Sequence, residues 1–347
     1  MKLEDRAWKE FNLSGENGIF KNYHGKRLTK EKRIDGNLPF LTAGEYNQGL
    51  GDFISNKDFI TFKDFISIDM FGNAFYHEHI CSGDDNIYFF INDELSKATK
   101  LFIVACINQN KSKYSYGKQF RQRNADTTKI LLPISKNEEF KPDWAFMEEY
   151  IKEKYAIKEK TYKEHIKKVI KELTYKEIVP LEKKEWKEFF INELFDVIIG
   201  KNIDGNKVDK ISGNIPYITR KESNNGLDGF IDEDICKLNN NFPVITIGNE
   251  TAQPFVQNFS FFTGTKVNIL IPKLKMSDKV LYFISTSLKQ QKSKYNYTYT
   301  INSTRIKKQN ILLPINENNE PDYEYMEQYM KNIMIKKYNK YLSYTKK

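Results

Sequence analysis

Short apolar runs bounded by Gly, Asn or Asp recur along most of the chain, and this pattern is typical of β-strands joined by tight turns. Helical periodicity appears in two short stretches, Lys97–Asn108 and Ser277–Leu288. We therefore expect an α/β (α+β) fold with a curved, mostly antiparallel sheet. The strands predicted with most support are Phe59–Phe62, Asn86–Ile91, Phe242–Ile247 and Lys266–Ile271.

Two longer stretches have the hydrophobic period of an α-helix. Each follows a Pro-Asp pair, Pro142-Asp143 or Pro321-Asp322, and Asp is a favoured N-cap residue. The first helix could run for about 30 residues, or about 45 Å. Its apolar face is formed by Ile151, Tyr155, Tyr162, Ile166, Val169 and Leu173, and that of the second helix by Met326, Met330, Met334, Tyr338 and Tyr341.

Lys and Glu cover the other faces of these helices, so the apolar stripe is too narrow for an isolated helix to be stable. We expect the two helices to pair as an antiparallel coiled coil. The alternative is that each helix packs on the domain that precedes it.

The chain repeats itself at an offset of 176 to 181 residues. Trp8-Lys9-Glu10-Phe11 returns as Trp186-Lys187-Glu188-Phe189, and Ile130-Leu131-Leu132-Pro133-Ile134 returns as Ile311-Leu312-Leu313-Pro314-Ile315. Codon bias explains shared composition but not shared order, so the chain contains two copies of one unit. Further ordered matches are Leu38–Thr42 with Ile215–Thr219, Gly49–Ile54 with Gly226–Ile231, Gly72-Asn73 with Gly248-Asn249, and Lys111–Tyr116 with Lys292–Tyr297.

The repeat and the helices together predict four segments. Residues 1–141 and 179–320 form two related recognition domains, and each is followed by a spacer helix, at 142–178 and 321–347.

The 347 residues carry a net charge of +9 and have a pI of about 9.0, which favours nucleic acid or an anionic membrane as a partner. No apolar run reaches about 18 residues, so we expect no membrane span. The charged first ten residues indicate no secretory signal. Three separated cysteines, Cys81, Cys106 and Cys236, suit free buried thiols in a reducing cytoplasm.

The basic charge is concentrated in two equivalent segments without acidic residues, 109–123 and 289–308, in which tyrosines are interleaved. Basic side chains neutralise phosphates, while Tyr, Asn and Gln donate hydrogen bonds to phosphates and bases. A second candidate surface is the Gly/Asn-rich segment 37–50 and its equivalent 214–227. The candidate DNA-binding residues are Lys111, Lys113, Tyr114, Tyr116, Lys118, Arg121, Arg123, Arg220, Lys221, Asn224, Lys292, Lys294, Tyr295, Tyr297, Arg305 and Lys307.

No catalytic motif accompanies these segments, so we predict no catalytic residue and no metal site. The chain has no P-loop and no Pro-Pro pair of the kind found in the target-base loop of a methyltransferase. The acidic residues do not form a nuclease motif that both copies share. His77, His79 and Cys81 could converge if they shared a strand face, but the second copy has neither His nor Cys in the matching region.

The doubled order of Trp-x-x-Phe start, β-rich domain, Leu-Pro-Ile exit, Pro-Asp cap and long helix resembles the specificity subunit of type I restriction–modification systems. It also resembles the similarly organised type IIB systems, and the exit sequence favours the latter. The resemblance implies two target-recognition domains that read a bipartite site in double-stranded DNA, with helices that set the spacer.

The same resemblance implies methyltransferase and restriction subunits as partners, which would carry S-adenosylmethionine and magnesium, so this chain itself would bind no cofactor. Ile151, Tyr155, Tyr162, Ile166, Met330, Met334 and Tyr338 are the candidate subunit-docking residues. Two alternatives remain: a single-chain nuclease or modification enzyme, and a duplicated RNA-binding protein.

Overall fold

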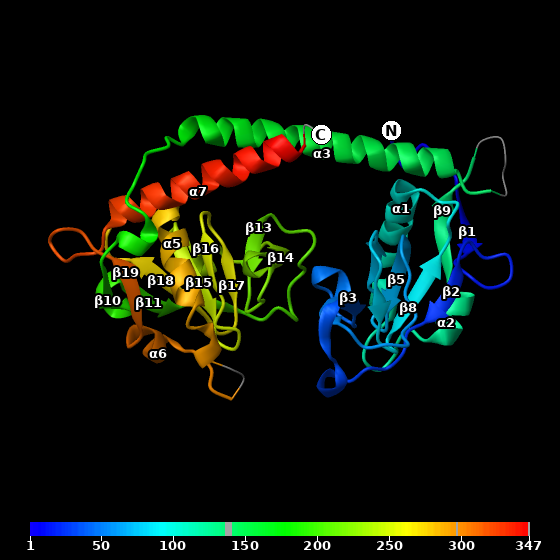
Figure 1. Ribbon diagram of the computed structural model, residues 1–347, viewed down its shortest axis with the longest axis horizontal. Coiled ribbons are helices and arrows are strands. Elements are labelled where there is room, and N and C mark those ends of the chain that lie inside the picture. The colour runs from blue at the N-terminus through cyan, green and yellow to red at the C-terminus, as the bar shows by residue number, and fades with distance from the viewer. Residues whose placement is uncertain (136–140, 296–297, 346–347) are drawn as a thin grey trace. The chain divides into compact units, whose positions relative to one another are not determined.

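The computed structural model describes residues 1–135, 141–295 and 298–345. The chain divides into two compact units, Met1–Tyr162 (unit 1) and Lys163–Lys347 (unit 2). Each unit contains both helices and sheets, and most strand pairs in both units are antiparallel. The expected mixed α/β fold with mostly antiparallel sheets is therefore confirmed (Figure 1).

Unit 1 is built around the four-stranded antiparallel sheet β2-β8-β5-β6. Every residue of the central strand β5 is buried. Helix α1 (Lys97–Asn108) packs against this sheet through Phe102 and Ile103. A smaller sheet has the order β4-β3-β7, with β3 and β7 parallel. The strands are β2 Lys21–His24, β3 Asp35–Leu41, β4 Leu50–Ile54, β5 Phe65–Asp69, β6 Ala74–His77, β7 Ser82–Gly83 and β8 Ile87–Ile91.

Unit 2 repeats this arrangement. The antiparallel sheet β11-β18-β15-β16 is covered by helix α5 (Asp278–Lys289), and a second sheet has the order β12-β17-β13-β14. The short helix α4 (Ile191–Leu194) has no counterpart among the described elements of unit 1. The strands are β11 Phe195–Ile199, β12 Asn202–Ile203, β13 Ile215–Ile218, β14 Leu227–Ile231, β15 Val244–Gly248, β16 Pro254–Gln257, β17 Phe262–Gly264 and β18 Val267–Pro272.

The repeated start and exit sequences pair with each other within each unit. Strand β1 (Trp8–Asn12) lies antiparallel to β9 (Lys129–Pro133), with Trp8 opposite Pro133. Strand β10 (Trp186–Phe190) pairs with β19 (Asn310–Pro314) in the same register, with Trp186 opposite Pro314. The two tryptophans stack on equivalent phenylalanines of α1 and α5, each at 6.2 Å between ring centroids. In each unit this strand pair therefore joins the start of the domain to its end, just before the long helix begins.

Both long helices form where the Pro-Asp pairs predict them, as α3 (Trp144–Glu172) and α7 (Tyr323–Tyr344). Asp143 accepts a hydrogen bond from the amide of Phe146 and Asp322 accepts one from the amide of Tyr325, both at 3.0 Å. Each cap carboxylate also forms an ion pair, Asp143 with Arg6 at 3.0 Å and Asp322 with Lys184 at 2.7 Å. The predicted N-caps are confirmed, although α3 ends at Glu172, so Leu173 is not on its helical face.

The packing of these helices combines the two expected arrangements. The first turns lie on their own domains, since Met147 of α3 is part of the unit 1 core and Met326 of α7 is part of the unit 2 core. Within unit 2, the last turns of α3 run antiparallel to α7 (Figure 1). Lys163 donates to the Thr345 carbonyl at 3.2 Å, and the Lys176 amide, just beyond the helix, donates to Asn332 at 3.3 Å. Antiparallel pairing is thus confirmed for this part of α3.

Two sequence-based expectations about the repeated strands and turns are wrong in detail. Phe59–Phe62 is not a strand, because Asp58 and Asp64 adopt positive φ on either side of it, and Phe59 and Phe62 instead fill two small apolar clusters. Gly72 and Gly248 are not equivalent: Gly248 ends β15, whereas Gly72 lies in the turn that follows β5.

All three cysteines are free, but only Cys81 is buried as expected; Cys106 is half-buried and Cys236 is exposed. Among the described residues, no helix is both long and apolar enough to cross a membrane.

Candidate nucleic-acid interface

Both basic segments occupy the same place in their units, between the helix on the sheet and the last strand. In unit 1 the segment leaves α1 through the turn Lys111–Lys113 and enters helix α2 (Gln122–Thr127). In unit 2 it leaves α5 through Lys292–Lys294 and enters helix α6 (Ser303–Lys307). The amide of Phe120 donates to the Met70 carbonyl at 2.8 Å, and the amide of Ile301 donates to the Asn249 carbonyl at 3.0 Å. These equivalent bonds fix both segments against the turn after the central strand.

Most charged candidates in these segments are exposed, whereas the first tyrosine of each is not. Tyr114 packs edge-on against Phe120 at 5.3 Å between centroids, and Tyr295 packs against the unit 2 core. Both therefore anchor their segments. Tyr116 is 83% exposed, and Tyr297 lies outside the described residues. The exposed cations are Lys111, Lys113, Lys118, Arg121, Arg123, Lys294 and Lys307. Lys292 and Arg305 are half-buried, and the guanidinium of Arg305 lies 4.0 Å above the ring of Tyr299.

The two candidate surfaces of each unit are joined by one repeated ion pair. Lys111 in the basic segment contacts Glu45 in the Gly/Asn-rich loop at 3.3 Å. In unit 2, Lys292 contacts Glu222 at 3.0 Å. Neither Glu45 nor Glu222 was among the predicted site residues, and the contact between the two surfaces was not predicted. The signal was present, because the two glutamates share the offset of the surrounding repeat.

An unusual left-handed turn follows each of these glutamates. Asn47, Gln48 and Gly49 have φ of 49°, 56° and 76°. Asn224, Asn225 and Gly226 have φ of 51°, 55° and 75°. Positive φ costs a residue other than glycine about 1 kcal/mol or more, and such strain persists only where the surrounding structure holds it. In unit 2 Asn225 donates to the Val256 carbonyl at 3.2 Å and to Gln257 at 3.1 Å, which holds the turn against β16.

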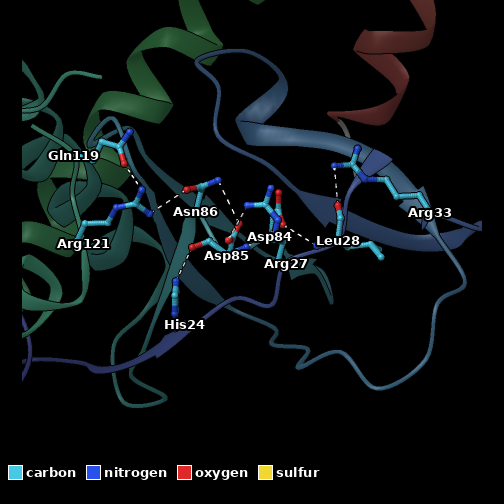
Figure 2. A network of polar contacts seen from close by, with 9 residues as sticks. All are labelled: His24, Arg27, Leu28, Arg33, Asp84, Asp85, Asn86, Gln119 and Arg121. Atoms are coloured by element: carbon cyan, nitrogen blue, oxygen red, sulfur yellow. Dashed lines mark hydrogen bonds and ion pairs between the residues drawn. The ribbon is translucent and has the colours of Figure 1, made fainter. Parts of the chain in front are cut away.

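Unit 1 carries a polar network next to these shared features. Figure 2 shows Arg121 between Asn86 and Gln119, and the guanidinium donates to both side-chain oxygens, to that of Asn86 at 3.1 Å. Asn86 donates onward to Asp85 at 3.3 Å, and Asp85 forms an ion pair with Arg27 at 3.4 Å. These contacts hold two arginines and an asparagine at the surface in defined positions.

Other side chains support the backbone of the same turn. His24 lies 2.5 Å from the Asp85 carbonyl, and Asp84 accepts from the amide of Leu28 at 2.9 Å (Figure 2). Arg33 in turn donates to the Leu28 carbonyl at 3.4 Å. The turn before β8 is therefore fixed from two sides.

Unit 2 carries a different network around a cavity of about 710 Å³. Arg220 forms an ion pair with Glu250, and Lys266 approaches the same carboxylate at 3.7 Å. Asp228 contacts both Lys221 at 2.6 Å and Lys210 at 2.9 Å. Burial opposes ionisation of Asp228, but hydrogen bonds from Lys221 and Lys210 outweigh it and hold its pKa below the ordinary value. The candidates Arg220 and Lys221 thus line a polar cavity, with Asn224 in the turn beside it.

The metal-like sequence in unit 1 does not form a shared face. Strand β6 ends at His77, so His79 and Cys81 lie beyond it, and His79 is exposed while the other two side chains are buried. His77 contacts the Ser67 hydroxyl at 2.8 Å and stacks on Phe65, and burial lowers its pKa to about 4. No group of three metal-binding side chains is found in residues 1–135, 141–295 and 298–345.

The candidate docking residues fall into two groups. Ile151 packs on the unit 1 core, Met330 packs on the unit 2 core, and Ile166 is fully buried where α3 runs beside α7. In contrast, residues 154–162 of α3 are exposed throughout, including Tyr155 at 60% and Tyr162 at 45%. Met334 and Tyr338 of α7 are half-buried. The exposed turn of α3 is therefore the part of the predicted docking surface that remains accessible.

Comparison with known proteins agrees with this duplicated arrangement. Residues 6–168 and 183–342 each match the type I restriction modification DNA specificity domain. The chain belongs to this family. The resemblance inferred from the doubled motifs is thus confirmed. Membership in a DNA specificity family gives no support to a single-chain nuclease, a modification enzyme or an RNA-binding protein.

One curated relative is the specificity subunit S.BcgI of a type II restriction enzyme from Heyndrickxia coagulans. It is 51% identical over 151 residues, which cover 43% of this chain and 44% of that protein. A solved S subunit of a type I system from M. genitalium is 15% identical, with a TM-score of 0.44 over 99% of this chain and 94% of that one. The HsdS subunit from Thermoanaerobacter tengcongensis is 12% identical, with a TM-score of 0.30 over 95% of this chain and 96% of that one.

Proposed function

We propose that the chain is the DNA-recognition subunit of a restriction–modification complex, in which each unit reads one half of a bipartite duplex site. The observation that carries this proposal is the interface repeated in both units of a DNA specificity family member. In each unit a basic segment is tied by Lys111–Glu45 or Lys292–Glu222 to a strained, left-handed turn. Positive φ in a surface turn marks functional loops, and exposed lysines supply phosphate contacts.

Methyltransferase and restriction subunits are the proposed partners, and they would carry S-adenosylmethionine and magnesium. The proposed docking contact is the face of α3 that carries Tyr155 and Tyr162, which are seven residues apart and both exposed, because apolar side chains exposed on a helix favour a protein partner. The relative from a type II restriction enzyme favours that type of system over type I. The cytoplasmic location expected from the sequence follows from the same partners.

Co-purification tests the partner assignment. The tagged full chain, expressed with its genomic neighbours, should retain a methyltransferase subunit identified by mass spectrometry. Tyr155→Asp should reduce that retention, whereas Lys160→Asp, which is exposed on the opposite face of α3, is the matched control and should leave it unchanged. Retention that is equal in wild type and Tyr155→Asp would place the docking contact elsewhere.

Activity of the isolated chain tests its non-catalytic role. We expect the purified chain to neither cleave nor methylate duplex DNA with magnesium and S-adenosylmethionine. Turnover that a point substitution in this chain abolishes would contradict the proposal.

The length of α3 tests the spacer assignment. Lys158 lies in the exposed stretch of α3, so four inserted residues there disturb neither the unit 1 core nor the segment beside α7. Such an insertion adds about 6 Å to the helix, which corresponds to about two base pairs of B-DNA. Because the insertion lies between Tyr155 and Tyr162, methylation mapping uses complexes that co-purification shows to retain the methyltransferase subunit, and it should show a changed spacer between unchanged half-sites. An unchanged spacer would exclude the helix as its determinant.

A further inference from the structure

The backbone defines which residues of the two networks are equivalent. Asn86 and Lys266 each directly precede the strand beside the central one, since Ile87 pairs with Asp69 and Val267 pairs with Gly248. The carbonyls of Ile87 and Val267 each accept a hydrogen bond at 2.9 Å, from Gly25 and Gly200 respectively. Asn86 and Lys266 therefore occupy one position in the repeated fold, and each belongs to the polar network of its own unit.

The composition of the two networks differs at every position that can be matched. Arg121 and Asn302 are equivalent, because each directly follows the residue whose amide anchors the basic segment. Only the arginine carries a charge. Conversely, Arg220 and Lys221 follow β13 where Ala43 and Gly44 follow β3, so this pair of cations exists in unit 2 alone. In contrast, the ion pairs Lys111–Glu45 and Lys292–Glu222 and the left-handed turns are present in both units.

The separation into shared and differing features predicts which residues contact phosphates and which contact bases. Contacts to phosphates position a protein on DNA without reading its sequence, whereas contacts to base edges specify it. Features shared by both units suit the first role, because both half-sites have the same backbone. Features that differ suit the second role, because the half-sites of an asymmetric target have different bases.

We infer that Arg121 with Asn86 in unit 1, and Arg220 in unit 2, read bases in the two half-sites. This inference rests on the proposed function and assigns the specificity within it. Arginine binds guanine O6 and N7 with two donors, and asparagine binds adenine N6 and N7. Asn86 and Gln119 hold the guanidinium of Arg121, and Glu250 holds that of Arg220. Each arginine keeps further N–H donors for a base, because a guanidinium has five.

Selection from a duplex pool with randomised positions tests this assignment on the purified full chain. Wild type should enrich a bipartite motif. Arg121→Ala should lose roughly tenfold or more of the discrimination at one or two base pairs in one half, and Arg220→Ala should do so in the other half. Arg121→Lys and Arg220→Lys should lose the same preference, because lysine keeps a phosphate contact but not the two-donor geometry. Lys113→Ala and Lys294→Ala, in the shared segments, should weaken binding and leave the motif intact.

The outcomes separate the inference from the proposed function. If wild type enriches no sequence, the proposed function itself is wrong. If wild type enriches a bipartite motif and both arginine variants retain it in full, only the base-reading assignment is overturned. Uniformly weaker binding that lysine restores would show that these arginines contact phosphates, and would also overturn it.

Discussion

Units 1 and 2 share a backbone framework, but different residue types occupy the equivalent buried positions in the two units. In unit 1 the buried His77 contacts the Ser67 hydroxyl at 2.8 Å, and at the equivalent place unit 2 buries Gln257 against the Thr246 hydroxyl at 3.0 Å. Unit 1 also buries Lys100 of α1 in an ion pair with Asp64 at 2.8 Å. The fourth residue after the N-cap of α5 is instead Leu281, which belongs to the unit 2 core.

The comparison shows that the framework depends on hydrogen bonding and shape rather than on particular residues. A buried polar group is tolerated when it has a partner, and an apolar group of similar size serves as well when the partner is absent. Among the described residues, the buried histidine and lysine side chains belong to unit 1, so the two units should respond differently to acid and to substitution.

The largest expected difference is the response to acid. Burial lowers the pKa of His77 to about 4, below the unfolded value of about 6.5. Because the unfolded state then binds more protons, unit 1 should lose stability as pH falls from about 6.5 to about 4, by about 3 kcal/mol. Hydrogen-exchange protection factors for β5, compared with those for β15 at each pH, measure this loss. His77→Gln, which installs the unit 2 residue, should remove it. An unchanged pH response in that variant would assign the loss to other groups.

Breaking the ion pair of Lys100 should have the next largest effect. Asp64→Asn removes the negative charge beside the buried ammonium, which keeps only neutral acceptors such as the backbone carbonyl of residue 64 at 2.8 Å. The change should destabilise unit 1 by about 2 kcal/mol, a value kept low because the carboxylate is partly exposed. Asparagine tolerates the positive φ of this position. Combining the change with Lys100→Leu should restore most of the loss in chemical denaturation. A double variant as unstable as Asp64→Asn would mean that the site requires a charge.

The N-caps of the long helices should behave alike in both units. Asp143→Ala and Asp322→Ala each remove a cap bond at 3.0 Å and an ion pair, and should each cost about 1 to 2 kcal/mol. Asp143→Asn and Asp322→Asn keep the cap and should cost less. Exchange protection at the start of α3 and α7 reports each loss separately. A large difference between the two losses of stability would show that the two caps contribute unequally to their helices.

The smallest effect concerns the shared basic segments. Lys113→Ala and Lys294→Ala should each lower the slope of the log binding constant against log salt by about 1, since each removes one phosphate contact. Fluorescence anisotropy with a labelled duplex over a salt series measures the slope. Slopes equal to that of the wild type would mean that these lysines face solvent in the complex.

Local features of this fold were predictable from the sequence. The helices at 97–108 and 278–289, both N-caps, and three of the four strands follow from short-range patterns. Contacts between distant residues were not predictable. The pairing of Trp8 with Pro133 and the ion pair of Lys111 with Glu45 depend on chain folding, although the repetition of each in the second half left a signal.

The sequence predicted which segments form the candidate site, but not which of their residues contact one another. The basic segments were predictable from their charge, but Tyr114 is not a DNA-contacting residue as predicted, because its packing on Phe120 gives it a structural role. Asn86 was not predicted, because a single asparagine in a turn has no pattern to mark it. Its importance comes only from its contact with Arg121, which lies 35 positions away in the sequence.

Exchange of one unit tests the central claim, that each unit reads its own half of the target, most directly. Residues 1–135 end just after β9, so they can be replaced by the corresponding domain of another specificity subunit with α3 retained. Methylation mapping of the assembled complex should then show one half-site changed, with the other half-site and the spacer preserved. A change in both half-sites, or in neither, would contradict the account.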